Sequence, residues 1–173
     1  MDIRDVQESD AEAIAAIYGY HVLNGTASYD LDPPPGEFHR DKIRRIQATG
    51  WPFIVAEADG GLAGYAYITQ FRDRAAYRFT AEDSIYVHPG AMRRGVGKAL
   101  LDELLKRCGT FGFRTIIAVI GGAEPASIAL HAKCGFREAG RLHAVGWKQD
   151  RWLDSVYMQI ELPGWHFPRD AIS

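Results

Sequence analysis

The sequence contains few cysteines: Cys108 and Cys134 are its only two in 173 residues. They form neither a CxxC redox motif nor a metal-ligand pattern, so we expect two reduced thiols, with a disulfide as the less favoured alternative, and no metal site. The first residues contain no apolar run of the kind found in signal peptides. We therefore expect a cytoplasmic protein, in a compartment where thiols stay reduced.

The sequence also has almost no net charge and no long hydrophobic run. Lys and Arg number 20 against 22 Asp and Glu, which gives a formal charge of −2. No apolar stretch approaches the ~20 residues that a membrane-spanning helix needs. We therefore expect no nucleic-acid partner and no membrane association, although a small local basic site remains compatible with this average. The 47% hydrophobic content and the length favour one folded domain, residues 1–173.

Hydrophobic periodicity and turn residues predict alternating helices and strands. Ser9 and Glu12 have the spacing of a capping box, and Asp59-Gly60-Gly61 indicates a hairpin between two strands. Helices are expected over residues 10–24, 37–49, 97–107 and 125–134, and strands over 53–58, 62–69, 84–87, 115–120 and 152–161. In the second helix, Phe38, Ile43 and Ile46 can share one face. This order predicts an α/β (α+β) fold with a mixed, largely antiparallel sheet flanked by helices.

The most informative segment joins the strand at 84–87 to the helix at 97–107. Gly95 and Gly97 allow backbone amides to approach a ligand, and a helix N-terminus favours anions. Arg93, Arg94 and Lys98 add positive charge, so a pyrophosphate is a suitable ligand. The residues after the glycines fit neither a Walker A loop nor a dinucleotide fingerprint. An ordinary strand-to-helix connection remains the alternative.

The segment Met92-Arg93-Arg94-Gly95-Val96-Gly97 resembles the acyl-CoA pyrophosphate loop of the GCN5-related N-acetyltransferase superfamily, except that Met92 replaces the usual Arg or Gln. Several segments are similar to phosphinothricin and methionine sulfoximine acetyltransferases: residues 15–18 with Asn24 and Thr26, 77–89, 127–131 with 135–136, and 146–154. The likeness spans roughly residues 2–162. The resemblance implies the fold of that superfamily, acetyl-CoA as co-substrate and a homodimer. It also implies acetyl transfer to a small amino acid such as phosphinothricin, methionine sulfoximine or methionine sulfone, by direct attack on the thioester.

The resemblance further implies roles for individual side chains. Glu82 matches the proposed catalytic carboxylate, although such a residue is otherwise often solvated at the start of a strand. His131 occupies the position of a tyrosine that protonates the departing thiolate in many members of the superfamily; a merely packed or exposed histidine is equally compatible. Arg72, Arg74 and Tyr77 match positions that bind the acidic end of the acceptor, with a solvated charged loop as the alternative.

A larger set of residues is expected to bind acetyl-CoA. Backbone groups of the strand should hold the pantetheine arm as an added strand would, and Glu124 stands where an asparagine is common. The expected set is Ile85, Tyr86, Val87, Arg93, Arg94, Gly95, Val96, Gly97, Lys98, Glu124 and Ser127. Phe136, Trp147 and Trp152 are expected in the core or in a subunit interface, to which residues 147–165 could contribute.

Two other functions stay open at this point. The acceptor could be another amine, such as a protein N-terminus or a polyamine, although the pair Arg72 and Arg74 argues against a polyamine. The chain could also be a non-catalytic acyl-CoA-binding sensor. A structural protein without a ligand is the least favoured reading.

Overall fold

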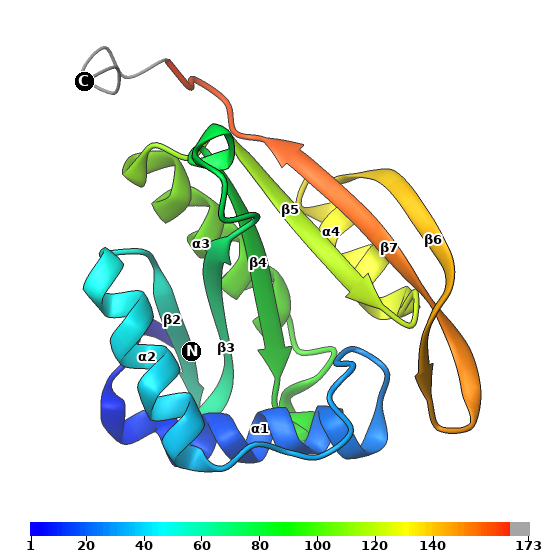
Figure 1. Cartoon of the computed structure of the whole chain (residues 1–173). Helices are drawn as coiled ribbons and strands as arrows, with labels where there is room; N and C mark the ends of the chain where they lie inside the picture. The colour runs from blue at the N-terminus through cyan, green and yellow to red at the C-terminus, as the bar shows by residue number, and fades with distance from the viewer. Residues whose placement is uncertain (167–173) are drawn as a thin grey trace.

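The computed structural model describes residues 1–166, so the last residues of the expected domain, 167–173, lie outside the described part. A seven-stranded sheet has the order β1-β2-β3-β4-β5-β7-β6 (Figure 1). The strands are β1 (Asp2–Asp5), β2 (Phe53–Ala58), β3 (Gly61–Gln70), β4 (Thr80–Val87), β5 (Thr115–Gly121), β6 (Arg137–Lys148) and β7 (Arg151–Glu161), and the helices are α1 (Ala11–Asn24), α2 (Gly36–Thr49), α3 (Val96–Phe111) and α4 (Pro125–Lys133).

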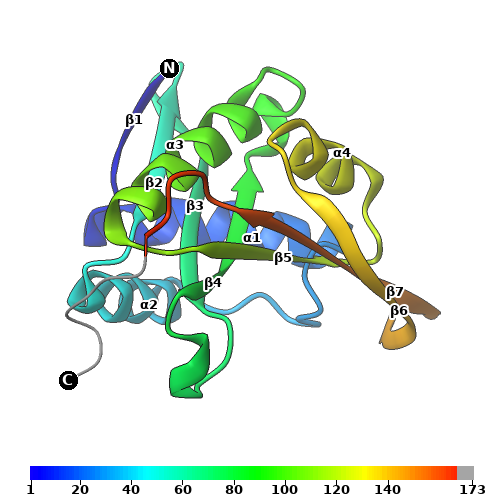
Figure 2. The ribbon, with the colours of Figure 1, turned by 90° about the horizontal axis from the view of Figure 1, so that it is seen from above.

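Helices cover both faces of the sheet (Figure 2). On one face, α1 and α2 pack Ile14, Ile17 and Ile43 against the aromatic side chains of β2 and β3. On the other face, Leu100 and Leu104 of α3 pack against Ile54, Ala66 and Ile116. Alternate residues of one strand therefore enter different cores, because side chains alternate across a sheet.

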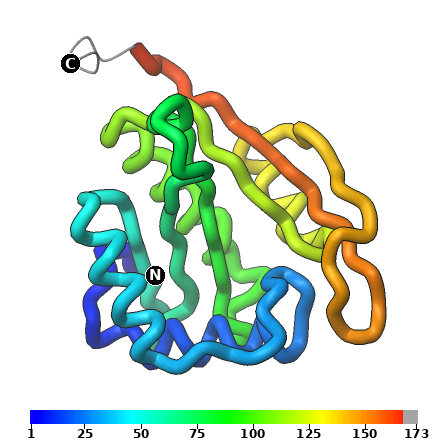
Figure 3. The backbone as a smooth tube through the Cα atoms, viewed as in Figure 1, coloured from blue at the N-terminus to red at the C-terminus, as the bar shows by residue number. Residues whose placement is uncertain are grey.

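One strand pair separates part-way along its length. β4 and β5 are the parallel pair in an otherwise antiparallel sheet. They pair only from Thr80↔Thr115 to Asp83↔Ala118, although β4 continues to Val87 and β5 to Gly121. Beyond Asp83 the two strands therefore diverge, as the backbone trace shows (Figure 3).

The predicted fold class, a mixed and largely antiparallel α/β sheet flanked by helices, is confirmed, and so is the hairpin. Asp59 and Gly60 both have positive φ, 53° and 81°, as a type I′ turn requires. Every predicted helix and strand is present, with ends shifted by a few residues. Both cysteines are free thiols, as expected.

Several local predictions were wrong. Strands β1 and β6 were not foreseen, and β4 begins at Thr80 because it pairs with β3 from Ala81 onward, four residues before the expected start. The expected Ser9–Glu12 capping box does not form; Asp10 instead accepts the N–H of Gln7 at 2.8 Å. In α2 it is His39, rather than Phe38, that is buried with Ile43 and Ile46.

Candidate active site

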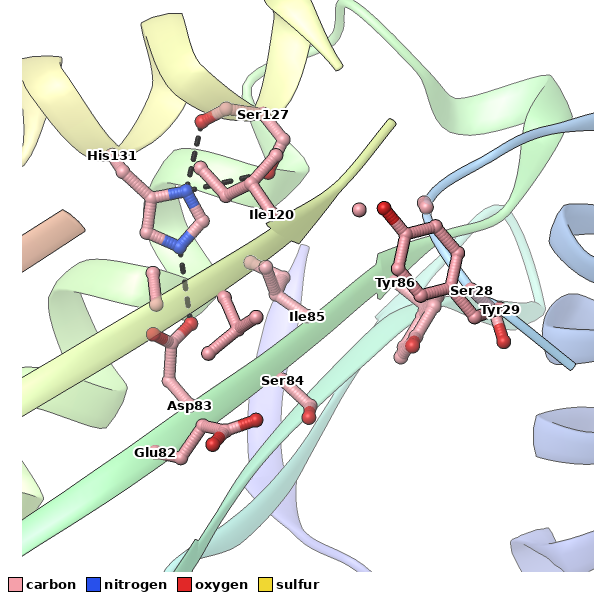
Figure 4. Close-up of a pocket in the computed structure, with 14 residues that line it drawn as sticks. Ser28, Tyr29, Glu82, Asp83, Ser84, Ile85, Tyr86, Ile120, Ser127 and His131 are labelled. Atoms are coloured by element: carbon pink, nitrogen blue, oxygen red, sulfur yellow. Dashed lines mark hydrogen bonds and ion pairs between the residues drawn. The ribbon is translucent and has the colours of Figure 1, made fainter. Parts of the chain in front are cut away.

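A cavity of about 230 Å³ lies where β4 and β5 diverge (Figure 4). Its lining comes from β4, β5, α4 and the loop between α1 and α2. The residues are Ala27, Ser28, Tyr29, Glu82, Asp83, Ser84, Ile85, Tyr86, Ala118, Val119, Ile120, Gly121, Ser127 and His131. The divergence of the strands thus brings together Glu82, His131, Ser127 and the middle of β4, all predicted from the sequence as site residues.

Glu82 and Asp83 are adjacent carboxylates on opposite sides of β4 (Figure 4). Burial raises the pKa of Glu82, the Asp83 charge raises it further, and the charge of Arg72 acts in the opposite direction. A carboxylate with a raised pKa is a better proton acceptor near neutral pH than an ordinary one. Glu82 therefore has the electrostatic environment of a general base.

Asp83 points to the other side of the strand, where it contacts His131. The two side chains are almost completely buried, and Nε2 of His131 lies 3.1 Å from Oδ2 of Asp83. Nδ1 of His131 lies 2.8 Å from the carbonyl oxygen of Ser127 and 3.4 Å from its hydroxyl. Burial opposes a charge on the ring, but the hydrogen bond and charge of Asp83, together with the Ser127 carbonyl, raise the pKa of His131.

The backbone of β4 presents hydrogen-bonding groups to the gap. The N–H of His88 donates to Ala63 of β3, so the alternating residues Val87 and Ile85 direct their backbone groups away from β3. Tyr86 was expected to bind acetyl-CoA through its backbone together with these two residues. It instead directs its backbone toward β3 and is a residue of the cavity lining. The carbonyl of Val87 contacts Nε2 of His21 at 2.8 Å.

The loop between α1 and α2 closes one side of the cavity, a feature that was not predicted from the sequence. Buried Lys148 at the end of β6 donates to the carbonyl of Ser28 at 2.7 Å. The Tyr29 hydroxyl donates to the carbonyl of Asp154 at 2.8 Å and accepts the N–H of Gly122 at 3.2 Å. These contacts join residues more than 90 positions apart, which sequence periodicity cannot reveal. We call residues 27–29 the roof loop.

The glycine-rich turn precedes α3 and has the geometry of an anion site. Arg93 and Gly95 have φ values of 59° and 83°, and no side chain caps the N-terminus of α3. A Cβ at Gly97 would lie 3.1 Å from Leu130 of α4 and 3.5 Å from Val87 of β4. This glycine therefore lets the turn pack closely against both elements next to the cavity.

Two of the expected phosphate-binding cations have partners. Arg94 pairs with Asp59 of the hairpin turn at 2.8 Å, and Lys98 pairs with Asp102 at 2.5 Å. Both pairs are exposed, and exposed pairs contribute little stability, so they can exchange partners at small cost. Glu124 caps α4 by accepting the N–H of Ala126 at 3.2 Å and is not among the residues that line the cavity.

The three expected acceptor-binding residues also lie outside the cavity lining. Arg72, Arg74 and Tyr77 belong to the exposed segment between β3 and β4. The guanidinium of Arg72 lies over the ring of Phe71 at 4.3 Å, and its charge acts on Glu82. The segment therefore lies next to the catalytic candidate without entering the cavity.

The described residues contain no group of three or more His, Cys, Asp or Glu that could hold a metal ion. Within residues 1–166 there is also no helix with the length and apolarity to cross a membrane. Phe136 is in the core as expected, whereas Trp147 and Trp152 are 54% and 63% exposed on the β6–β7 hairpin.

Comparison with known proteins agrees with this geometry. Residues 17–136 match the model of the acetyltransferase (GNAT) family. The chain is 48% identical over 161 residues to a phosphinothricin N-acetyltransferase of Alcaligenes faecalis, covering 92% of this chain and 82% of that protein. It is 33% identical to an L-methionine sulfoximine/L-methionine sulfone acetyltransferase of Salmonella typhimurium, covering 94% and 95% of the two chains.

A solved structure gives the same result in three dimensions. The crystal structure of a GNAT superfamily phosphinothricin acetyltransferase from Sinorhizobium meliloti, in complex with acetyl-CoA, superimposes with a TM-score of 0.94 at 45% identity. The alignment covers 98% of this chain and 93% of that one. The chain therefore belongs to the GNAT family of acetyltransferases and, within it, to the group of phosphinothricin and methionine sulfoximine acetyltransferases.

Proposed function

We propose that this acetyl-CoA-dependent N-acetyltransferase acetylates the amino group of a small amino acid at the β4–β5 cavity, with Glu82 as the general base. The observation that carries this proposal is the position of Glu82: a partly buried carboxylate with a raised pKa, in the lining of the cavity and beside Arg72. Phosphinothricin, methionine sulfoximine and methionine sulfone are the acceptors that the names of the relatives suggest.

The reaction needs a neutral amine, because only the free electron pair of nitrogen attacks the thioester carbonyl. An α-amino group has an ordinary pKa of about 8, so a base of moderate strength suffices. Glu82 removes the proton directly or through a water molecule. Backbone N–H groups of Ile85 and Val87, which are directed away from β3, are suitably oriented donors for the carbonyl oxygen or the pantetheine amides.

Acetyl-CoA binds, in this proposal, with its pyrophosphate at the turn before α3 and its pantetheine along β4. Arg93, Arg94, Gly95, Val96, Gly97 and Lys98 form the pyrophosphate site, where the uncapped N–H groups of α3 favour an anion. Arg94 and Lys98 leave Asp59 and Asp102 to do so. Ser127 and Glu124, at the start of α4, contact the arm nearer the thioester.

The acceptor's acidic end is proposed to bind Arg72, Arg74 and Tyr77. A guanidinium forms paired hydrogen bonds with carboxylate or phosphinate oxygens, and these arginines lie between β3 and β4, close in sequence to Glu82. An acceptor held there by its acidic end can extend its amine toward Glu82.

We also propose that the enzyme is a cytoplasmic homodimer of one-domain subunits, residues 1–173. Free cysteines are consistent with a reducing compartment. Leu142, Val145, Trp147 and Trp152 all expose between 46% and 63% of their surface on the β6–β7 hairpin. A concentration of exposed apolar side chains on one projecting hairpin favours a subunit interface there.

A panel of acceptors tests the proposed function. Purified enzyme with acetyl-CoA is offered α-amino acids with and without an acidic side group, a peptide N-terminus and a polyamine, and release of the CoA thiol is measured. We expect turnover with glutamate-like amino acids and little with the polyamine. Turnover with the peptide alone would replace the proposed acceptor class, and no turnover despite acetyl-CoA binding would favour a sensor.

A further inference from the structure

In the observed geometry neither ring nitrogen of His131 faces a ligand directly, because each already has a hydrogen-bond partner in the protein. Nε2 faces the Asp83 carboxylate at 3.1 Å and Nδ1 faces the Ser127 carbonyl at 2.8 Å. A carbonyl oxygen only accepts hydrogen bonds, so Nδ1 carries a hydrogen. The raised pKa of His131 favours a hydrogen on Nε2 as well, donated to the Asp83 carboxylate, and the ring is then an imidazolium.

Among the titratable side chains around His131, Asp83 is the one that balances the positive charge of the imidazolium. On β4 the neighbouring titratable group is Glu82; on α3 it is Cys108, and at the end of α4 it is Cys134. Burial raises the pKa of Cys108 to about 12 and that of Cys134 to about 11, so both thiols are neutral at physiological pH. Phe136 packs edge-on against the imidazole ring at 5.0 Å.

Ser127 connects this buried pair to the cavity. Its hydroxyl lies 3.4 Å from Nδ1 of His131, one helical turn away on α4, and Ser127 is itself partly exposed in the lining. The second oxygen of Asp83, Oδ1, is buried without a hydrogen-bond partner among the described residues. The three side chains therefore form a line from a buried carboxylate, through an imidazole, to a hydroxyl at the cavity (Figure 4).

We propose that Asp83, His131 and Ser127 form a proton relay to the departing thiolate, in which Asp83 is a positioning residue that retains the second proton on His131, and the Ser127 hydroxyl is the group that reaches the sulfur. This inference rests on the proposed acetyl transfer. It replaces direct donation by His131 with donation through Ser127.

The protons balance as follows. When the amine nitrogen bonds to the carbonyl carbon and the C–S bond breaks, the bonding electrons go to sulfur. The Ser127 O–H proton passes to sulfur, and the Nδ1 proton of His131 turns from the Ser127 carbonyl to the Ser127 Oγ, 3.4 Å away, and passes to it. His131 is left neutral, with Nε2–H still facing Asp83. An acceptor ammonium loses two protons on becoming an amide; Glu82 passes these to solvent, and solvent returns one to His131.

Two substitutions separate the parts of the relay. Asp83→Asn removes the charge behind His131, so the pKa of His131 measured by NMR on labelled histidine should fall by at least about one unit from its wild-type value. Ser127→Ala should leave that pKa unchanged and lower kcat by at least about tenfold, a larger change than that in KM for acetyl-CoA, whereas Ser127→Thr, which keeps the hydroxyl, should restore most of kcat.

The pH profile gives a further check. Because the relay needs protonated His131, kcat should decline as the pH rises through the pKa of His131, and Asp83→Asn should move this decline to lower pH. Wild-type kcat in Ser127→Ala would overturn the relay while leaving acetyl transfer intact. An unchanged His131 pKa in Asp83→Asn would overturn the positioning role.

Two further outcomes are distinguishable. If Asp83→Asn does not fold, the Ser127→Ala and Ser127→Thr pair still decides whether the hydroxyl donates the proton. If the wild type acetylates no amine, the proposed function and the relay both fail, and the NMR titration then identifies Asp83 and His131 as a structural ion pair.

Discussion

Two neighbouring carboxylates on β4 have different surroundings and therefore different chemistry. Glu82 lines the cavity within the influence of Arg72, while Asp83 is buried against His131. The Asp83 charge also raises the pKa of Glu82. Glu82 is thus suited to accept a proton, and Asp83 is suited to retain a proton on His131. This difference is expected when the environment rather than the residue type determines protonation.

Replacing Arg72 should change the pH dependence of catalysis. In the proposed mechanism the carboxylate form of Glu82 is the base, so activity should be lost as pH falls through its pKa. Arg72 lowers that pKa, and Arg72→Gln should therefore move the acidic limb of kcat/KM to higher pH. Arg74→Gln is the matched control, because Arg74 is not among the charges that act on Glu82.

In both arginine variants the acceptor KM should rise if these residues bind its acidic end. The shift of the acidic limb and the rise in acceptor KM are separable. The pH at which kcat/KM falls is measured from the full pH profile, whereas the acceptor KM is measured at one pH. An acidic limb that stays in place in Arg72→Gln, or moves equally in Arg74→Gln, would contradict this electrostatic account.

Single residues also show how far the sequence alone reaches. Glu82 and His131 were predicted because they match positions of a known family, and both line the cavity. The contact between Asp83 and His131 was not predicted, since it joins residues 48 positions apart in different elements. The same is true of Lys148 and Ser28, which are separated by 120 positions.

Among the secondary-structure elements, the roof loop depends on close packing against the end of β5. A Cβ added to Gly121 would lie 2.7 Å from the carbonyl oxygen of Thr26 and 3.3 Å from the ring of Tyr29. The Thr26 carbonyl cannot move aside without displacing the roof loop. That loop is held in place because Tyr29 donates to β7 and Lys148 of β6 donates to Ser28.

Gly121→Ala should therefore lower stability and raise the acceptor KM, with a smaller effect on the KM for acetyl-CoA. Gly109→Ala is the control: it lies within α3, and its added Cβ would meet nothing within 4 Å. Because alanine is a better helix former than glycine, Gly109→Ala should raise the free energy of unfolding by about 0.5–1 kcal/mol without changing either KM. Denaturant unfolding measures the free energy of unfolding, and steady-state kinetics measure the two KM values. If Gly121→Ala and Gly109→Ala changed these quantities equally, the roof-loop explanation would be excluded.

The two strands missed from sequence have a common physical cause. β1 has only four residues, none of them buried, and β6 is exposed along nearly all its length. Neither therefore shows the alternation of apolar and polar residues that predicts a strand. The start of β4 was missed because Glu82 and Asp83 are polar residues placed in the cavity. The central strands and all four helices were predictable because their apolar faces are buried.

For the molecule as a whole, the most unusual surface is the β6–β7 hairpin, which projects beyond the helices (Figure 1). The rings of Trp147 and Trp152 pack edge-on at 5.3 Å, and both remain more than half exposed. Large aromatic side chains are frequently the residues that dominate binding energy in interfaces.

Trp152→Ala should weaken the proposed dimer, raising its dissociation constant by about thirtyfold, which corresponds to about 2 kcal/mol. Phe111→Ala serves as control, because Phe111 is similarly exposed, at 49%, but lies at the end of α3. Light scattering over a concentration series measures the oligomeric state. A wild type that stays monomeric at every concentration would contradict the dimer proposal.

The central claim is that Glu82 performs chemistry on an amine in the β4–β5 cavity, and one comparison tests it most directly. Acetyl-CoA affinity and kcat are measured for wild type and Glu82→Gln with the best acceptor of the panel. Since a positioned base typically contributes about 10²–10⁴-fold, kcat should fall by at least about a hundredfold while acetyl-CoA affinity stays within about twofold. A Glu82→Gln variant with wild-type kcat would contradict the account.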